Sequence, residues 1–371
     1  SMWIHEHKNW PNFTWDAASL ASKLADIRHR QGRLLGRMEG LGFELKREAS
    51  LCTLTSDVVK SSAIEGENLN PEEVRSSIAR RLGIDVAGLA PASRDVESVV
   101  EMMLDATQQY FKPLTKDRLF DWHAALFPTG RSGMQRITVG GWRSATSGPM
   151  QVVSGPLGHE KVHFEAPSAD RLENEMQIFL DWFGNGNDID PVLKAGIAHL
   201  WFVTIHPFED GNGRIGRAIG DMALARADGT PDRFYSLSAQ IEAERKDYYD
   251  RLERQQRNAL DITDWLEWIL DCLGRAFSSA ENTLGNVLYK AQLWDRINLK
   301  PVNDRQRLII NRMLDDDFVG HMNTSKYAKL TKCSNDTALR DILELKERGF
   351  FIQNPGGGRS TSYRLLEREE M

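Results

Sequence analysis

The sequence predicts a mainly α-helical protein that carries a small β-hairpin and ends in a separate mixed module. Apolar residues recur at the three- and four-residue spacing of helices over most of the chain. Residues 129–170 differ, because Gly, Pro and Ser are frequent there and short β-like runs occur at 136–139, 151–154 and 162–165. From residue 303 onward the chain reads as three helices followed by a strand, a glycine-rich turn and a second strand.

The composition is typical of a globular protein of two to three domains. Of 371 residues, 41% are hydrophobic and 27% are charged, and the net charge of −6 gives no overall positive field for nucleic acid. Cys52, Cys272 and Cys333 follow no disulfide or metal spacing, as in proteins of a reducing compartment. No apolar run reaches the length of a membrane span or of a signal peptide, so we expect a cytoplasmic protein without a membrane partner.

The N-terminal region predicts long helices behind an aromatic arm at residues 2–14. Residues 55–65 read as helix, and Gly66 ends it in the manner of a C′ glycine. Ser61 and Glu65 are four residues apart, so they face the same way. A carboxylate at the C-terminal end of a helix is slightly unfavourable with the helix dipole, so a nearby cation would stabilise Glu65. The alternative is a solvated acid at a helix end.

Further helices lead into and out of the region that is rich in Gly, Pro and Ser. They are expected at residues 71–90, 93–111, 115–127, 168–183, 193–204 and 241–258. Within the region itself, the composition of the turn between the last two β-like runs predicts a hairpin or flap.

The stretch HPFEDGNGRIGR, from His206 to Arg217, contains an imidazole, two carboxylates, an Asn between two glycines, and two arginines. Helical runs flank it, so it predicts a tight loop with its glycines at the N-terminus of the second helix. Such a terminus carries free N–H groups and partial positive charge, and glycines let a phosphate approach them. Asp210 can supply the oxygen ligand that Mg²⁺ needs beside phosphates.

The other charged groups of this stretch suit phosphate chemistry as well. Arg214 and Arg217, three residues apart, can clamp outer phosphates. His206 titrates near neutral pH and can accept a proton from an attacking hydroxyl. A single His before Pro is usually a turn residue and a lone GxG is usually a loop, but their concentration in twelve residues favours a site.

This stretch resembles the signature of the Fic family, HPFx(D/E)GNGRxxR, with every fixed position filled. The resemblance implies a Fic-type helical core that transfers AMP from ATP to a Tyr, Thr or Ser hydroxyl of a target protein, self-modification included. It implies that His206 is the general base, that Asp210 holds Mg²⁺ and that Phe208 anchors the loop. The implied phosphate contacts are Gly211, Asn212, Gly213, Arg214 and Arg217. Gly213 stands where the related Doc-type kinases usually carry Lys, which argues against that branch.

The segment SSAIEGENLN, at residues 61–70, is similar to the inhibitory motif (S/T)xxxE(G/N) of Fic proteins. The resemblance implies that Glu65 reaches Arg217 and occupies the place of a γ-phosphate contact, so that an N-terminal helix inhibits the enzyme. Glu65 can also activate water for removal of AMP, and the sequence does not rank the two directions.

Two more features follow from the same resemblance. The flap would align an extended target segment by strand addition. A Tyr pair such as Tyr248 and Tyr249 lies near the nucleotide base in the family, so one of the two is a candidate to stack on adenine. The alternative is a pair of core tyrosines.

The C-terminal helices at 303–313, 324–330 and 335–348, with the two strands that follow, resemble a winged helix. From residue 300 to 371 there are 13 Lys and Arg against 11 Asp and Glu, and the third helix has a net charge of −1. A domain that binds the DNA phosphate backbone strongly is usually more basic than this module. DNA binding is therefore one candidate role, and protein docking or self-modification is its rival.

The sequence thus predicts three parts and one leading function. The parts are 2–90, a helical segment with the inhibitory helix, 91–293, the Fic core and following helices, and 294–371, the winged-helix-like domain. The leading function is an autoinhibited protein adenylyltransferase. The alternatives are a DNA-binding transcription regulator with the Fic core as sensor, and transfer of another nucleotide or a phosphocholine-like group. The oligomeric state, a homodimer included, stays open.

Overall fold

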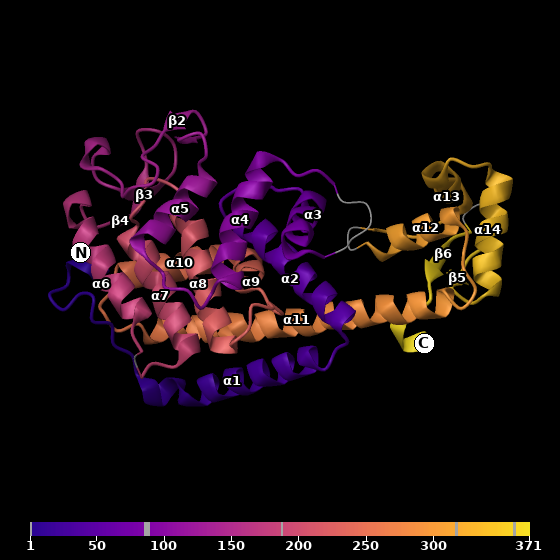
Figure 1. Cartoon of the computed structure of the whole chain (residues 1–371), viewed down its shortest axis with the longest axis horizontal. Coiled ribbons are helices and arrows are strands. Elements are labelled where there is room, and N and C mark those ends of the chain that lie inside the picture. Colours follow the sequence, from indigo (N-terminus) through magenta and orange to yellow (C-terminus); the bar gives the residue numbers. More distant parts are fainter. Residues whose placement is uncertain (1, 85–89, 187, 316–317, 359–360) are drawn as a thin grey trace. The chain divides into compact units, whose positions relative to one another are not determined.

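Two helices, α7 (Pro191–Ile205) and α8 (Asn212–Asp228), form the buried centre of the larger of two structural units, Ser1–Thr283 (Figure 1). Helix α7 is apolar on all sides, as expected of a core helix. It begins at the capping residue Asp190, whose carboxylate accepts a hydrogen bond from the Val192 N–H at 2.8 Å. The structure is a computed structural model that describes residues 2–84, 90–186, 188–315, 318–358 and 361–371.

Small residues allow the central helices to approach their neighbours closely. A Cβ atom at Gly216 of α8 would lie 2.9 Å from Val203 Cγ1 of α7. A Cβ atom at Gly196 of α7 would lie 3.2 Å from Ile269 Cγ2. The apolar run before the motif therefore fixes where α8 begins, because α8 packs along α7 over most of its length.

The remaining helices of this unit surround that pair, and α2, α4 and α5 pack on α8 whereas α6 packs on α7. Their bounds are α1 (Ala17–Glu39), α2 (Phe43–Ile64), α3 (Pro71–Leu82), α4 (Arg94–Gln108), α5 (Lys116–Leu126), α6 (Leu172–Gly184), α9 (Leu237–Ala243), α10 (Arg245–Gln256) and α11 (Thr263–Ile297), whose residues after Thr283 belong to the second unit. Short 3-10 helices occur at η1 (Ile4–Glu6), η2 (Ala145–Ser147) and η3 (Ala169–Arg171). The prediction of a mainly helical protein is confirmed.

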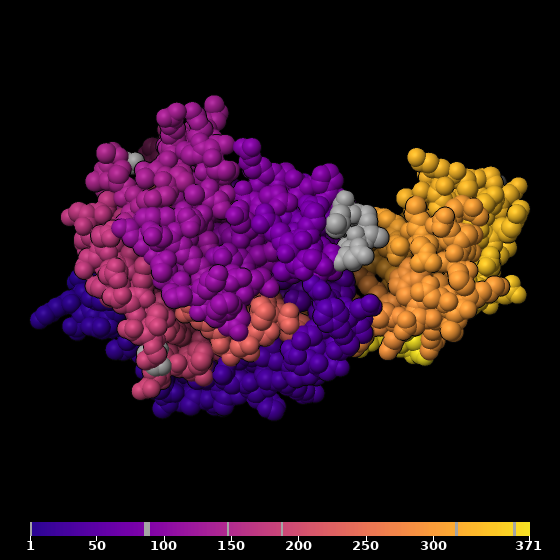
Figure 2. Space-filling model, in the orientation of Figure 1, coloured from indigo at the N-terminus to yellow at the C-terminus, as the bar shows by residue number. Residues whose placement is uncertain are grey.

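Two small antiparallel hairpins lie between α5 and η3, in the purple-to-magenta stretch of the chain that forms part of the surface in Figure 2. Ser132 and Thr138 of this stretch bond to Asp210 and Glu209 of the motif loop. The first pairs β1 (Arg131–Ser132) with β2 (Gln135–Arg136), and the second pairs β3 (Gln151–Ser154) with β4 (Lys161–Glu165). The second is the predicted flap. The expected strand at 136–139 is wrong beyond its first residue, because the Thr138 N–H donates to the Glu209 carboxylate at 2.9 Å instead of to a strand.

The second unit, Leu284–Met371, has its own apolar core around Ile309, Tyr327 and Ile342. The buried Asp341 carboxylate accepts hydrogen bonds from Arg305, Asn303 and the Tyr327 hydroxyl. The elements are α12 (Asp304–Leu314), α13 (Thr324–Thr331), α14 (Asn335–Glu347), β5 (Phe351–Gln353), β6 (Tyr363–Leu365) and η5 (Arg368–Glu370). The expected order of helices and strands is confirmed.

The assignment of this unit as a winged helix stays a prediction. The division of the chain into three parts also stays a prediction. Within the part of the chain that the structure describes, no helix combines the length and the apolar character that a bilayer crossing requires.

Gly216→Ala tests the close approach of α7 and α8. The added methyl group would press on Val203 and Phe202, so we expect the free energy of unfolding to fall by about 1–3 kcal/mol. Gly220→Ala is the matched control, because its methyl group meets open space in the same helix. It should be neutral or stabilise by up to about 1 kcal/mol, since alanine is the better helix former. Chemical denaturation measures both, and equal values for the two variants would contradict the packing argument.

Candidate active site

The loop between α7 and α8 opens onto a cavity of about 480 Å³. The predicted residues that line it are Glu65, His206, Gly213, Arg217, Tyr248 and Tyr249. The hairpin β3–β4 contributes further wall through Val152, Val153 and His163. The other predicted residues adjoin these: Ser61, Asp210, Gly211, Asn212 and Arg214 contact the lining residues or the same loop. The structure therefore brings the predicted set together at one end of α8.

His206 ends α7 with a backbone conformation unusual for a residue other than glycine, at φ 53° and ψ 57°. Its ring Nδ1 lies 3.3 Å from the Val203 carbonyl oxygen. If Nδ1 carries the proton and donates it there, Nε2 keeps a free lone pair. Burial lowers the pKa of His206 to about 4, and the positive charge of Arg143 acts in the same direction. The imidazole is therefore neutral at pH 7, as a general base must be.

The loop after His206 is closed by side chains. The buried Asn212 side chain accepts a hydrogen bond from the Phe208 N–H at 3.0 Å and donates to the Phe208 carbonyl oxygen at 2.8 Å. The Phe208 ring is fully buried and stacks on His123 at a centroid distance of 4.2 Å, which confirms Phe208 as the anchor. These two bonds hold the Asn212 side chain against the loop backbone, so its main part is to fix the loop that presents the start of α8.

His123 also supports this loop, and the sequence did not indicate that role. Its Nε2 lies 3.0 Å from the Asp210 carbonyl oxygen. The contact joins positions 87 residues apart, so no local pattern in the helix predicted at 115–127 indicates it.

Gly211 is the N-cap residue of α8 and has a φ of +87°, which favours glycine. A Cβ atom there would lie 2.9 Å from Phe127 Cε2, so a larger residue would also displace the neighbouring ring. Helix geometry gives the first N–H groups of α8 no intrahelical acceptor. The Gly211 N–H donates to Asp210 Oδ1 at 2.7 Å, and the N–H groups that follow point out of the helix end.

A carboxylate of the protein itself lies at this helix end. Glu65 Oε1 would be 2.1 Å from a Cβ atom at Gly213, so the carboxylate fills the space that the missing side chain leaves. A negative group at a helix N-terminus is favourable. The position that the sequence predicts for a phosphate thus fits an anion, with Glu65 in its place.

Arg217 is held by both residues of the predicted inhibitory pair. Its guanidinium donates to the Ser61 hydroxyl at 2.8 Å, to the Ser61 carbonyl oxygen at 2.8 Å and to Glu65 Oε1 at 2.7 Å. The Arg217 side chain is only 2% exposed, whereas Glu65 is 33% exposed. The glutamate end of the pair is therefore the one that solvent, and a competing anion, can reach.

Arg214 has a similar partner that sequence reasoning missed. Its guanidinium lies 3.1 Å from Glu67 Oε2 and 5.4 Å from the centre of the Phe127 ring. Gly66 lies between the two glutamates with a φ of +82°, so the chain turns and both carboxylates meet α8. The signal in the sequence was an acid two residues beyond Glu65, which the motif (S/T)xxxE(G/N) does not include.

Asp210 offers one carboxylate for a metal ion. Its oxygens accept hydrogen bonds from the Gly211 N–H and from the Ser132 hydroxyl. Within the described ranges, no three His, Cys, Asp or Glu residues form a group that could hold a metal ion. This arrangement fits Mg²⁺, which is commonly bound by one or two carboxylates together with substrate phosphates and water.

The two tyrosines of α10 differ in environment. The Tyr248 ring is buried, and its hydroxyl lies 2.6 Å from His199 Nε2. Tyr249 is 37% exposed, and the Arg245 guanidinium lies 5.8 Å from the centre of its ring. Tyr248 therefore has a core role, and Tyr249 has the ring face available to a flat ligand.

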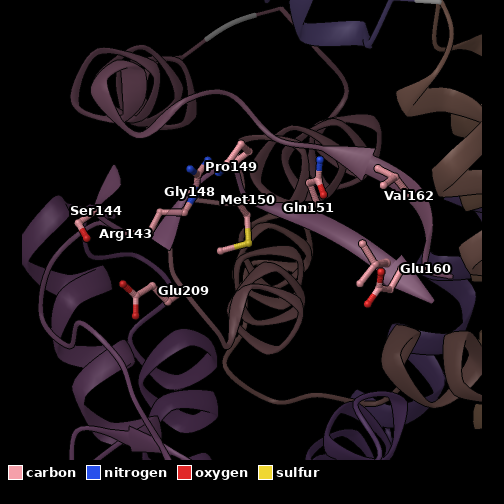
Figure 3. Close-up of a pocket in the computed structure, with 10 residues that line it drawn as sticks. Arg143, Ser144, Gly148, Pro149, Met150, Gln151, Glu160, Val162 and Glu209 are labelled. Carbon is pink, nitrogen blue, oxygen red and sulfur yellow. The ribbon is translucent and has the colours of Figure 1, made fainter. Parts of the chain in front are cut away.

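A second cavity, of about 430 Å³, lies beside the hairpin β3–β4, and Val153 lines both cavities. Figure 3 shows Met150 between Glu209 of the motif loop and the two strands, with Glu160 toward the far end of the hairpin. A segment that ran along the hairpin would enter this second cavity next to the motif loop.

Comparison with known proteins assigns families to two regions of the chain. Residues 113–224, which include the whole motif, match the Fic/DOC family. Residues 3–84 match a domain of unknown function, DUF4172. The chain therefore contains a Fic/DOC family domain, as the motif predicted.

Two relatives are named protein adenylyltransferase Fic. The protein from Nematostella vectensis is 32% identical over 115 residues, which are 30% of this chain and 25% of that protein. The protein from Aedes aegypti is 26% identical over 233 residues, which are 59% of this chain and 40% of that protein. The chain thus matches well under two thirds of the length of these curated relatives.

Two solved structures have the same fold. A Fic family protein from Desulfovibrio desulfuricans G20 has a TM-score of 0.52 at 22% identity and covers 93% of this chain and 96% of its own. A Fic domain containing signaling protein from Bacteroides thetaiotaomicron has a TM-score of 0.51 at 21% identity, over 71% of this chain and 97% of its own. At these identities the likeness shows a Fic-type fold and nothing further.

The buried imidazole behind the site gives a pH dependence of stability. Burial lowers the pKa of His199 to about 4, from an ordinary value of 6.5. Below pH 6.5 the unfolded chain binds a proton that the folded chain still excludes, so the free energy of unfolding falls as the pH falls toward 4. The contribution of this residue is fully present above pH 6.5.

We expect His199→Gln to have a shallower pH slope than the unchanged protein, by up to about 1.4 kcal/mol per pH unit, between pH 6.5 and 4. Urea denaturation at a series of pH values measures the slope. Identical slopes in the two proteins would show that His199 takes up its proton in the folded state as readily as in the unfolded state.

Proposed function

We propose that this protein is an adenylyltransferase that transfers AMP from ATP to a hydroxyl side chain of a target protein. The observation that carries the proposal is the Glu65 carboxylate at the N-terminus of α8, on Arg217, in a cavity that His206 also lines. An anion site next to a neutral imidazole is what transfer of a phosphate-bearing group to a hydroxyl requires. The names of the relatives support the same reaction.

In the proposed reaction, the triphosphate of ATP lies against the first N–H groups of α8, and Arg214 and Arg217 bind its outer phosphates. The target hydroxyl oxygen forms a bond to the α-phosphorus as the bond from that phosphorus to the bridging β-phosphate oxygen breaks. The proton of the hydroxyl passes to His206 Nε2, and pyrophosphate leaves. Mg²⁺, with Asp210 as its protein ligand, would neutralise charge on the phosphates.

The hairpin β3–β4 is the proposed guide for the target. An extended segment can pair with a hairpin edge through backbone hydrogen bonds, and its side chains then alternate in direction. The second cavity beside Val153 would receive a side chain of that segment while its Tyr, Thr or Ser hydroxyl faces His206. Tyr249 is the residue that we propose stacks on the adenine ring.

Two glutamates of one segment make the resting state inhibited in this proposal. Glu65 on Arg217 and Glu67 on Arg214 occupy the two groups that outer phosphates would use. A γ-phosphate must displace Glu65 before ATP can adopt a productive position. The same carboxylate, once displaced, can activate water for the reverse process, removal of AMP.

DNA binding by the second unit remains the alternative that the sequence raised. Helix α14 would be the reading helix, yet it exposes Leu339 and Leu343 and carries a net charge of −1 over residues 335–348. Apolar exposure and negative charge favour contact with protein over contact with a phosphate backbone.

Glu65→Gly tests the proposed inhibition. Removal of the carboxylate frees Arg217 and the end of α8, so transfer of label from α-labelled ATP to protein should rise by about tenfold or more, equivalent to about 1.4 kcal/mol. The double variant Glu65→Gly with His206→Ala should lose that gain, because no base then accepts the hydroxyl proton. The proposal fails if Glu65→Gly remains silent with target proteins present, or if the double variant labels as well as Glu65→Gly alone.

Glu67→Gln tests the second contact. Glu67 is 51% exposed, so its pairing with Arg214 is screened by water, and its loss should raise affinity for ATP by only about twofold to fivefold. Glu72→Gln, five residues further along the chain in the first turn of α3 and also exposed, is the matched control. Titration calorimetry with ATP measures both. An affinity gain that is equal in the two variants would assign the effect to net charge and not to Arg214.

A further inference from the structure

We propose that Arg143 is a positioning residue for the catalytic base, because its guanidinium fixes the backbone on which the His206 side chain is mounted. This inference rests on the proposed function. Neither the motif at 206–217 nor the family comparisons assign a role to Arg143, which lies 63 residues before His206 in the chain.

Arg143 donates hydrogen bonds to the backbone carbonyl oxygens of three successive residues, 205 to 207. Its Nε donates to the His206 carbonyl oxygen at 2.7 Å, and one terminal nitrogen donates to the Ile205 carbonyl oxygen at 3.2 Å. Its backbone N–H donates to the Pro207 carbonyl oxygen at 2.9 Å. The last carbonyl groups of a helix have no intrahelical donor, and here an arginine supplies donors at the end of α7.

These hydrogen bonds stabilise the unusual backbone conformation of His206. The left-handed conformation is unfavourable for a residue with a side chain, so the surroundings must hold it in place. That conformation also turns the carbonyl groups of the loop away from the direction they would have in a continued helix. Arg143 binds the carbonyl oxygen of this left-handed residue itself, while the His206 ring contacts the Val203 carbonyl oxygen.

Burial of the guanidinium indicates that the arrangement has more than a packing role. Arg143 is 5% exposed, and the hydrogen-bond acceptors of its side chain are backbone carbonyl oxygens, with no carboxylate among them. A buried charge without a carboxylate partner is costly, and burial lowers the pKa of Arg143 to about 10. An apolar residue would fill the same space at lower cost but would leave the loop carbonyls without donors.

The same side chain joins the loop to the hairpin that we propose guides the target. A terminal nitrogen of Arg143 donates to the Pro167 carbonyl oxygen at 2.5 Å, two residues after β4 ends. Arg143 itself precedes β3 and lines the second cavity, as Figure 3 shows. The Arg143 side chain therefore bonds both to the residue that bears the base and to the chain just after the hairpin. In this way it would fix the distance between the imidazole and the hydroxyl of a target segment bound along the hairpin.

The test uses the full chain with Glu65→Gly as the active parent and adds Arg143→Gln or Arg143→Lys. We expect Arg143→Gln to lower the kcat of label transfer about 100-fold, because a base misplaced by about 1 Å costs that much. The Kd for ATP should stay within about twofold, since Arg143 contacts no phosphate-binding group. The kcat of Arg143→Lys should lie between that of the parent and that of Arg143→Gln, because one ammonium group cannot bond to three carbonyl oxygens at these positions.

Arg257→Gln in the same parent is the matched control. Arg257 donates to the Val162 carbonyl oxygen of the same hairpin at 2.7 Å but makes no bond to the motif loop, so its kcat should match that of the parent. A kcat of folded Arg143→Gln within about twofold of the parent would overturn the proposal. If Arg143→Gln does not fold, Arg143→Lys decides: a full kcat overturns the proposal and a reduced kcat at unchanged ATP affinity supports it.

A second readout separates this inference from the proposed function. If the Glu65→Gly parent transfers no label, the function fails, but the positioning claim can still be measured. The imidazole NMR signal of His206, identified by its absence in His206→Ala, should shift or broaden in Arg143→Lys and stay in place in Arg257→Gln. An unchanged signal in Arg143→Lys would overturn the positioning role whatever the activity.

Discussion

The contact between Glu65 and Arg217 is the interaction on which the arrangement of the site depends. It joins the end of α2 to the first turns of α8 through an arginine that is almost fully buried. Breaking it would leave a buried cation without its counter-charge, which is costly unless another anion replaces the carboxylate. In the proposed function, an external anion on Arg217 would take the place of the protein carboxylate. That exchange would be the physical basis of a resting state that a phosphate-bearing ligand replaces.

The motif loop is rigid because side chains satisfy its backbone. Asn212 binds both backbone groups of Phe208, His123 contacts the Asp210 carbonyl, and Arg143 binds carbonyls at the end of α7. Loops usually meet water at the surface, whereas the backbone groups named here meet protein side chains. A site whose groups are fixed before the ligand arrives loses little energy to reorganisation during the reaction. In this chain, that fixation draws on residues from three separate stretches of sequence.

Much of this could be predicted from the sequence where the signal was local. Helical periodicity gave the helices, and the density of functional groups from His206 to Arg217 located the site. The spacing of Ser61 and Glu65 gave a shared face, since four residues make about one helical turn. Arg143 was a candidate for orienting the loop that faces the site, but its partners, like the loop contact of His123 and the turn at Gly66 that aims Glu67, could not be predicted. Each acts through a contact with residues far away in the chain, and none has a spacing that a periodic pattern would reveal.

Val153 lines both cavities beside the flap, and this shared residue has a thermodynamic consequence. A movement of β3 that opens one of the two cavities for a ligand also changes the shape of the other cavity, because Val153 moves with the strand. Linkage then requires that the two occupants alter each other's affinity by equal factors, because the cycle of binding steps must close. The Val153 side chain would thus couple the binding of the nucleotide in one cavity to the binding of the target segment in the other, in a favourable or an unfavourable sense.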